Sequence, residues 1–256
     1  MMINQIRADF YRQRHTWGCY LTVLLTIIFS AVITARESVG GIMINGTDLL
    51  QRLESSRWTV LSGLQSATLS SSVLLYGYLG IFVIVVGYEF SQSTYKNTLI
   101  SRISRLQFII AKFLTLFLDL LRLVLLYYLT AFLTGKIAGR AWGESLPTLL
   151  GHLGMMILTV AFFMNVIFGI GLLLLILTHS TVIAAVVIAV WPLLISLLGM
   201  ATKWSWLKYF DFMGTAQQIT TQTLVTIKFG PIIGTSVGLI IVIIVGSTIA
   251  IRHQEL

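Results

Sequence analysis

The chain has 256 residues, of which 57% are hydrophobic and only 10% are charged, and its mean hydropathy is +0.92. A soluble globular domain carries roughly 25% charged residues, and a soluble protein this apolar would expose large adhesive patches. The composition therefore predicts an integral membrane protein. The net charge of +8 does not indicate a nucleic-acid partner, because the basic residues flank apolar stretches, where Lys and Arg anchor helices at lipid headgroups.

The N-terminal segment is polar and basic, and no cleavable signal peptide is evident before the first apolar stretch. Ile3, Ile6 and Phe10 recur in it at helical spacing. This pattern predicts an amphipathic helix over residues 1–16 that lies in the inner headgroup layer, with a plain basic tail as the alternative. The polar face of that helix offers Arg7, Arg12 and Arg14.

Six stretches are apolar for about the 20 residues that a membrane span requires. We therefore expect an all-α integral membrane protein whose residues 1–256 form a single transmembrane domain of six helices. The fourth and fifth stretches are joined only by the Thr178-His179-Ser180 turn, so they are expected to form an antiparallel hairpin. In chain order the predicted spans cover 17–34, 72–88, 108–134, 149–177, 181–199 (which contains Pro192) and 231–251.

The distribution of basic residues gives the orientation. Placing the N-terminus inside assigns the same number of Lys and Arg residues to each side, but the inner segments are shorter and so carry the higher basic density. Basic residues in short loops near span ends weigh most in the positive-inside rule. Both termini are therefore predicted to be cytoplasmic.

The segment 201–230, predicted to lie outside between spans five and six, is rich in aromatic side chains. Trp and Tyr gather at membrane interfaces, where their amphipathic rings sit among the headgroups. The segment is therefore either an interfacial belt or a surface that contacts an amphipathic substrate. Its aromatic residues are Trp204, Trp206, Tyr209, Phe210 and Phe212.

The inner segment 87–112, between spans two and three, reads GYEFSQSTYKNTLISRISRLQFIIAK. Its apolar positions fall at spacings of three and four, which predicts a short amphipathic helix on the membrane face. Such a helix can present a ridge to a soluble partner; a basic loop that merely sets topology is the alternative. The apolar positions are Leu99, Ile100, Ile103 and Leu106.

A second pattern runs through the same segment and consists of Glu89, Thr94, Leu99, Ser104, Arg105 and Lys112. A Glu at the end of span two, a Thr five residues later, a short helix, a Ser-Arg pair and a Lys that opens span three resemble the type-2 family of ABC-transporter permeases. The likeness is greatest to its bacitracin- and lantibiotic-resistance branch. The family usually has Gly before the Thr, where this chain has Ser93.

The resemblance implies that residues 89–105 form a coupling segment that docks on an ATP-binding subunit. It further implies two copies of that subunit, a second permease copy or paralogue, a hydrophobic or peptide substrate, and a bacterial plasma membrane. ATP and magnesium would be bound by the partner, and no cofactor is expected on this chain. The absence of a GxxxxGK[ST] sequence agrees with that division.

Catalytic and metal-binding patterns are absent from the sequence. The four histidines are scattered, none belongs to an HExxH pattern, and the single cysteine, Cys19, cannot form an internal disulfide or a CxxC site. The stretch 61–65, LSGLQ, differs at one position from the LSGGQ motif of ATP-binding subunits and falls on the predicted outer side, so we interpret it as coincidence. No enzyme activity is expected.

Asp119 and Arg122 lie well inside the predicted third span, where a charge costs about 2.5–3.5 kcal/mol on insertion scales. They are three residues apart and can pair on one helix face, either as a structural lock or as part of the transport route. Asn165 in the fourth span is expected to hydrogen-bond a neighbouring helix. Close helix approach is expected at Gly77, Gly80, Gly169 and Gly171.

These observations predict the permease subunit of an ATP-driven exporter. The rival hypothesis from another class is a non-transporting immunity or sensor protein that captures a peptide at the outer surface through the aromatic segment. A membrane enzyme is a third possibility, for which the sequence supplies no recognisable residues.

Overall fold

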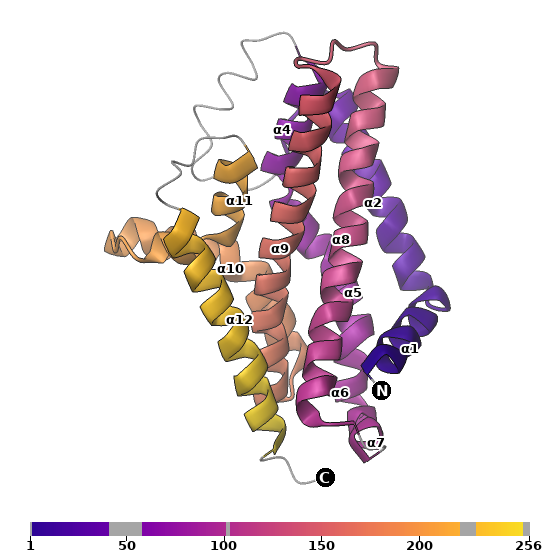
Figure 1. Ribbon diagram of the computed structural model, residues 1–256, viewed down its shortest axis with the longest axis vertical. Coiled ribbons are helices and arrows are strands. Elements are labelled where there is room, and N and C mark those ends of the chain that lie inside the picture. Colours follow the sequence, from indigo (N-terminus) through magenta and orange to yellow (C-terminus); the bar gives the residue numbers. More distant parts are fainter. Residues whose placement is uncertain (1, 41–57, 101–102, 221–228, 253–256) are drawn as a thin grey trace.

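The computed structural model describes residues 2–40, 58–100, 103–220 and 229–252, and in these ranges every regular element is a helix (Figure 1). The elements in chain order are α1 (Met2–Arg14), α2 (Trp17–Ala35), α4 (Val60–Ser70), α5 (Ser72–Phe82), a π-helical turn η1 (Val83–Gly87), α6 (Tyr88–Ser91), α7 (Thr94–Ile100), α8 (Arg105–Ile137), α9 (Leu146–Thr178), α10 (Thr181–Thr202), a short 3₁₀ turn η2 (Leu207–Phe210), α11 (Phe212–Thr220) and α12 (Phe229–Arg252).

Five helical stretches in the described ranges are long and apolar enough to cross a membrane, and they correspond to five of the six predicted spans. The third predicted span lies in α8, which is not among these five and which carries Lys112, Asp119 and Arg122 along its length. The five stretches are Trp17–Ala35, Ser72–Ser91, Leu146–Thr178, Thr181–Thr202 and Gly230–Arg252.

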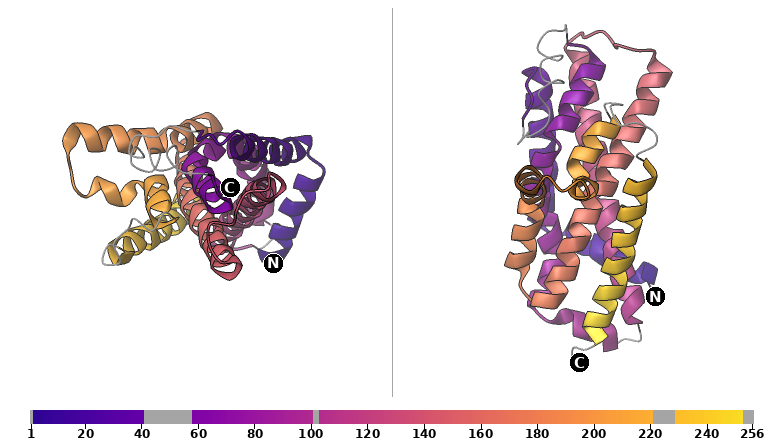
Figure 2. Two further views of the ribbon diagram at one scale, coloured as in Figure 1. Left: turned by 90° about the horizontal axis from the view of Figure 1, so that it is seen from above. Right: turned by 90° about the vertical axis from the view of Figure 1, so that its left-hand side faces the viewer.

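The bundle is organised around α8 and α9, which lie side by side along the long axis of the molecule (Figures 1 and 2). α1, α2 and α4 pack on α8, whereas α10, α11 and α12 pack on α9. Each central helix has 33 residues and is therefore about 50 Å long at 1.5 Å per residue. Both exceed the roughly 30 Å of a hydrocarbon core.

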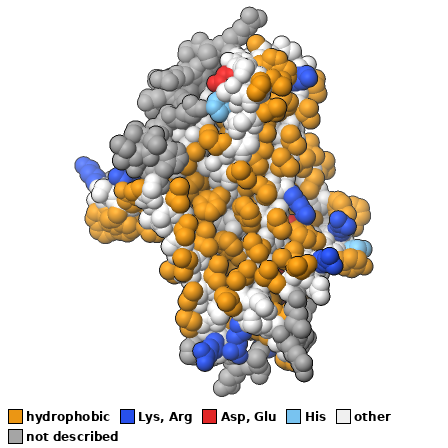
Figure 3. All heavy atoms as spheres, viewed as in Figure 1, with side chains coloured by type: hydrophobic (Ala, Val, Ile, Leu, Met, Phe, Trp, Pro, Cys, Tyr) orange, Lys and Arg blue, Asp and Glu red, His pale blue; other side chains and the backbone are white. Residues whose placement is uncertain are grey.

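Exposed apolar side chains cover the sides of this bundle (Figure 3). They include most of the outward positions of α2, α10 and α12, such as Leu24, Val186 and Val242. Lys and Arg side chains gather at the bottom of the same view. A soluble protein would not expose such a surface, so the fold is that of a multi-pass membrane protein.

Hydroxyl groups join the upper half of α8 to its neighbours. Ser30 of α2 donates to the carbonyl of Tyr127 at 2.6 Å, and the hydroxyl of Tyr127 donates to the carbonyl of Ala67 in α4 at 2.9 Å. The hydroxyls of Tyr128 and Thr68 lie 2.7 Å apart. Hydrogen bonds of this kind hold helices together where lipid removes the hydrophobic drive for association.

The predicted hairpin between the fourth and fifth spans is confirmed. α9 ends at Thr178, His179 adopts the left-handed conformation with φ of 54°, and the hydroxyl of Ser180 accepts the backbone N–H of Ile183 to begin α10. The predicted close approach is also found at this pair, because a Cβ atom at Gly171 would overlap the side chain of Ile188.

The chain beyond α10 leaves the bundle sideways before it returns. In Figure 1 the end of α10 and the following turn project to the left at about mid-height, α11 rises from there, and α12 runs down to the end of the bundle that carries α7. Residues 221–228 of the predicted outer segment lie outside the described ranges.

Candidate functional site

Two residues of the predicted coupling pattern, Glu89 and Lys112, meet in the interior. Glu89 lies on α6, directly after the π-helical turn, and Lys112 lies on the second turn of α8. The Nζ atom of Lys112 is 2.8 Å from Oε2 of Glu89. Lys112 is fully buried and Glu89 is 6% exposed, so this is a pair of charges removed from solvent.

Helix α1 completes the site with Asp9 and Arg12. Lys112 donates to both carboxylate oxygens of Asp9, at 2.8 and 2.9 Å. Arg12 donates to Glu89 at 3.0 Å and to Asp9 at 2.9 Å. Each cation therefore contacts both anions, and the formal charges of the four residues cancel. We call Asp9, Arg12, Glu89 and Lys112 the ion cluster.

The π-helical turn supplies the remaining acceptor. The backbone carbonyl of Val85 accepts from Arg12 at 3.1 Å and from Lys112 at 3.2 Å. A π turn widens the helix locally and is found most often at functional sites. On the opposite side of this turn, Gly87 packs closely on Thr181 at the start of α10, where a Cβ atom would come within 2.7 Å of the Thr181 side chain. The turn thus connects the ion cluster to the α9–α10 hairpin.

Sequence reasoning missed the part that α1 plays in this site. A helix is present at Met2–Arg14, but Arg12 contacts Glu89 instead of lying on an outward polar face, and Asp9 is only 1% exposed. One signal was present, because Asp9 is the only acidic residue before Glu37 and lies three residues before Arg12. Burial raises the pKa of the Asp9 carboxyl, and the charge of Lys112 opposes that rise.

The expected pairing of Asp119 with Arg122 is wrong at the level of contact, because no ion pair joins them in the described structure. Asp119 instead accepts the side-chain amide of Gln13 at 2.7 Å, and the Arg122 guanidinium stacks 4.1 Å from the ring centre of Phe10. Both partners belong to α1. Lys112, Asp119 and Arg122 of α8 therefore each contact a side chain of α1.

Asn165 is buried in α9, as expected, but it lies apart from the ion cluster. Its carbonyl oxygen Oδ1 has no hydrogen-bond partner among the described residues, so the predicted interhelical bond is not seen at that atom. An unpartnered buried amide oxygen is costly, and nothing else in the described structure explains its presence.

The short helix predicted in the inner segment 87–112 is present. α7 covers the predicted short helix at the bottom of the bundle in Figure 1. The hydroxyl of Thr94 donates to the carbonyl of Glu89 at 3.4 Å, and the hydroxyl of Ser104 caps α8 by accepting from Gln107. Arg105 is half-buried at the start of α8.

The two predicted apolar positions in α7, Leu99 and Ile100, differ in exposure. Leu99 is 8% exposed and packs into the core, whereas Ile100 is 68% exposed. Ile100 is therefore the apolar side chain that α7 exposes, and Leu99 belongs to the core.

The turn before Thr94 explains why a Gly is expected there. Ser93 has φ of 56°, in the left-handed region that glycine adopts without steric cost. We predict that Ser93→Gly raises thermal stability in mild detergent by about 1 kcal/mol, because it removes a Cβ conflict worth roughly 1–2 kcal/mol. Ser91→Gly, at the last residue of α6, is the matched control and should not raise stability, because Ser91 is not in the left-handed region. Equal effects of the two substitutions would contradict this account.

The outer aromatic residues separate into an exposed and a buried group. Trp204 and Trp206 are 56% and 50% exposed, and their rings stack with centroids 5.6 Å apart. Phe212 is 1% exposed and stacks on Phe163 of α9, so its predicted role as an outer contact is wrong. Tyr209 and Phe210 are half-buried between these groups.

No protein-family model, curated protein or solved structure matches this chain. In the part of the chain that the structure describes, no group of three or more His, Cys, Asp or Glu side chains could hold a metal ion. The ion cluster, joined to the predicted coupling segment through α6, is therefore the arrangement on which a functional assignment rests.

Proposed function

We propose that this chain is the permease subunit of an ATP-driven exporter of the type-2 kind. In this proposal α8 crosses the membrane in addition to the five spans above, and both termini lie in the cytoplasm of a bacterium. Two copies of a separate ATP-binding subunit would dock beneath α7, and a second permease would complete the translocation unit. The substrate would be a hydrophobic or amphipathic peptide or antibiotic.

The partners on α1 support α8 as a span. Charges inside a bilayer are tolerated where they face protein and are paired. Lys112 pairs with Asp9 and Glu89, and Asp119 accepts a hydrogen bond from Gln13. Arg122 stacks on Phe10, and Arg105 and Lys136 lie near the two ends of α8. Tyr127 and Tyr128 of the same helix form the hydroxyl contacts with α2 and α4.

The placement of the ends supports a common inner side. In both Figures 1 and 2 the beginning of α1, the end of α12 and the turn between α9 and α10 lie in the half of the molecule that carries α7. The Lys and Arg side chains at the bottom of Figure 3 agree with the positive-inside rule for that side.

The observation that carries the proposal is the continuous path from α7 to the ion cluster. Only Gln92 and Ser93 separate α7 from α6, Thr94 of α7 is hydrogen-bonded to the backbone of Glu89, and the Glu89 side chain contacts Arg12 of α1 and Lys112 of α8. A displacement of α7 by a partner would therefore act on three helices through charged contacts. Packed interiors transmit such shifts as rearrangements between discrete states.

The experiment is affinity purification of the tagged chain from its native membrane in mild detergent, with identification of the proteins that accompany it. We expect a stoichiometric ATP-binding subunit. Ile100→Asp and Arg105→Glu should each weaken that association about tenfold, or about 1.4 kcal/mol, if they lie among the few central residues that dominate an interface. Lys136→Glu, at the opposite end of α8, is the control and should leave the association unchanged.

Substitution of Glu89 is a poor test of coupling, because its loss would leave the buried Lys112 without one of its partners. Recovery of the chain alone from several detergents would contradict the exporter proposal. That result would favour the immunity or sensor protein, for which the exposed Trp204 and Trp206 pair offers a contact surface at the outer side.

A further inference from the structure

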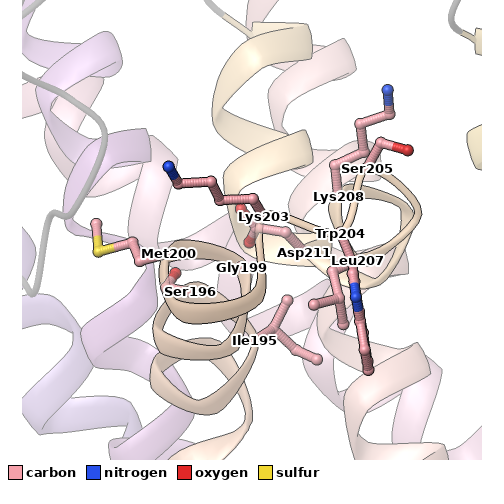
Figure 4. Close-up of a pocket in the computed structure, with 10 residues that line it drawn as sticks. All are labelled: Ile195, Ser196, Gly199, Met200, Lys203, Trp204, Ser205, Leu207, Lys208 and Asp211. Carbon is pink, nitrogen blue, oxygen red and sulfur yellow. The ribbon is translucent and has the colours of Figure 1, made fainter.

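A pocket with a volume of about 360 Å³ lies between the end of α10 and the turn η2 (Figure 4). Its walls come from the last two turns of α10 and from the segment that follows, so the pocket is built by the chain leaving the bundle. Apolar side chains of Ile195, Met200 and Leu207 contribute to its lining, together with the hydroxyls of Ser196 and Ser205.

Two lysines flank this pocket without an acidic partner. In Figure 4 the side chains of Lys203 and Lys208 extend in different directions, and both ammonium groups point away from Ile195. Both side chains are exposed, and within the described structure neither lies within ion-pair distance of a carboxylate. Lys208 lies over the Tyr209 ring at 5.2 Å. Exposed lysines are solvated by water, and two of them beside one apolar pocket favour an anionic ligand over a neutral one.

Asp211 is the one acidic residue in the lining, and it is already engaged. Its Oδ1 atom accepts the backbone N–H of Gly214 at 3.0 Å. Burial raises the pKa of its carboxyl, and the hydrogen bond from Gly214 opposes the rise. The two lysines therefore leave an excess of positive charge at the pocket.

The pocket lies where a membrane span ends, which indicates the kind of anion that it would meet. α10 has 22 residues and is long and apolar enough to cross a membrane, and Lys203 directly follows its last turn. The exposed, stacked Trp204 and Trp206 are residues typical of the level at which a span meets the headgroups. Basic pockets between spans bind anionic lipid headgroups on the cytoplasmic side, and a lysine ammonium can pair with a lipid phosphate at the outer headgroup level in the same way.

We propose that this pocket binds the phosphate of an anionic phospholipid between Lys203 and Lys208, with the glycerol and the first acyl carbons against Ile195 and Leu207. The inference does not depend on the exporter proposal, because lipid binding requires neither an ATP-binding subunit nor transport. Its effect would be to hold the turn η2 at the headgroup level through a lipid that the protein retains.

The test uses the purified full-length chain in mild detergent with added phosphatidylglycerol or phosphatidylcholine, and native mass spectrometry of the retained lipids. We expect preferential retention of phosphatidylglycerol. Lys203→Gln and Lys208→Gln should each reduce its binding roughly fivefold, and the double variant about 25-fold, since each lysine near the surface contributes about a factor of five. Lys136→Gln, which removes another exposed lysine stacked on an aromatic ring, should change nothing.

A second variant fills the pocket without changing its charge. A Cβ atom at Gly199 would meet no atom within 4 Å, so Gly199→Leu should be tolerated by the fold and should also abolish retention of phosphatidylglycerol. Unchanged retention in both Gly199→Leu and the double lysine variant would overturn the proposal. Equal retention of phosphatidylcholine, or displacement of the lipid by inorganic phosphate alone, would also overturn it, the latter in favour of a soluble phosphate ligand.

Discussion

Replacing Lys112 by methionine is expected to destabilise the protein by about 3–5 kcal/mol, the range found when one partner of a buried ion pair is removed. The substitution leaves Asp9 and Glu89 buried side by side with only Arg12, which is 29% exposed, to compensate them. The measurement is the temperature at which the purified chain loses its monodisperse elution in mild detergent. The variant should melt well below the parent chain.

The control lies on the same helix. Lys136→Met removes a lysine that is exposed and stacked on Trp142, and it should change stability by less than about 1 kcal/mol. A further variant isolates the charge imbalance. Adding Asp9→Asn to Lys112→Met restores a neutral cluster and should recover part of the loss. If the Lys112→Met and Lys136→Met variants have the same melting temperature, the ion cluster does not stabilise the fold.

Adding a single methyl group at Gly171 is also expected to destabilise the protein strongly. The new Cβ atom would overlap Ile188, so Gly171→Ala should separate α9 from α10 or force Ile188 out of its rotamer. Overpacking of this kind costs about 1–3 kcal/mol, and it overrides the gain of roughly 1 kcal/mol that Ala brings inside a helix. Thermal melting in mild detergent again gives the measurement.

Gly154 provides the matched comparison for this prediction. It lies in the same helix, but a Cβ atom there would meet nothing within 4 Å, so Gly154→Ala should leave stability unchanged or raise it. The double variant Gly171→Ala with Ile188→Ala should melt higher than an additive sum of the two single changes, because the second change removes the overlap. A loss of the same size at both glycines would place the effect in helix propensity instead of packing.

The ion cluster also determines which helices are linked to α7. Lys112 and Glu89 were expected as separate members of a coupling segment, but in the structure they share one buried contact with α1. The first helix is therefore tied to the second and third spans by charge and not only by its lipid-facing residues. A partner that moves α7 would have to move α1 with it.

The positions and order of five apolar spans and the tight hairpin between α9 and α10 followed from the sequence, whereas the helices α4 and α11 lie between the predicted spans and were not expected. Apolar stretches of about 20 residues are fixed by the thickness of the bilayer, and a connection of two residues leaves only an antiparallel arrangement. Capping positions such as Ser104 and Ser180 were also readable, because hydroxyl side chains satisfy the first N–H groups of a helix.

The partners of the charged side chains were decided only by the tertiary structure. Lys112 and Asp9 are 103 residues apart, and Gln13 and Asp119 are 106 apart, so no local pattern relates them. Asp119 and Arg122 share a helix face, yet packing of α1 against α8 gives each of them a different partner. Spans are local because lipid acts on each helix separately, whereas ion pairs depend on which helices pack together and at what height.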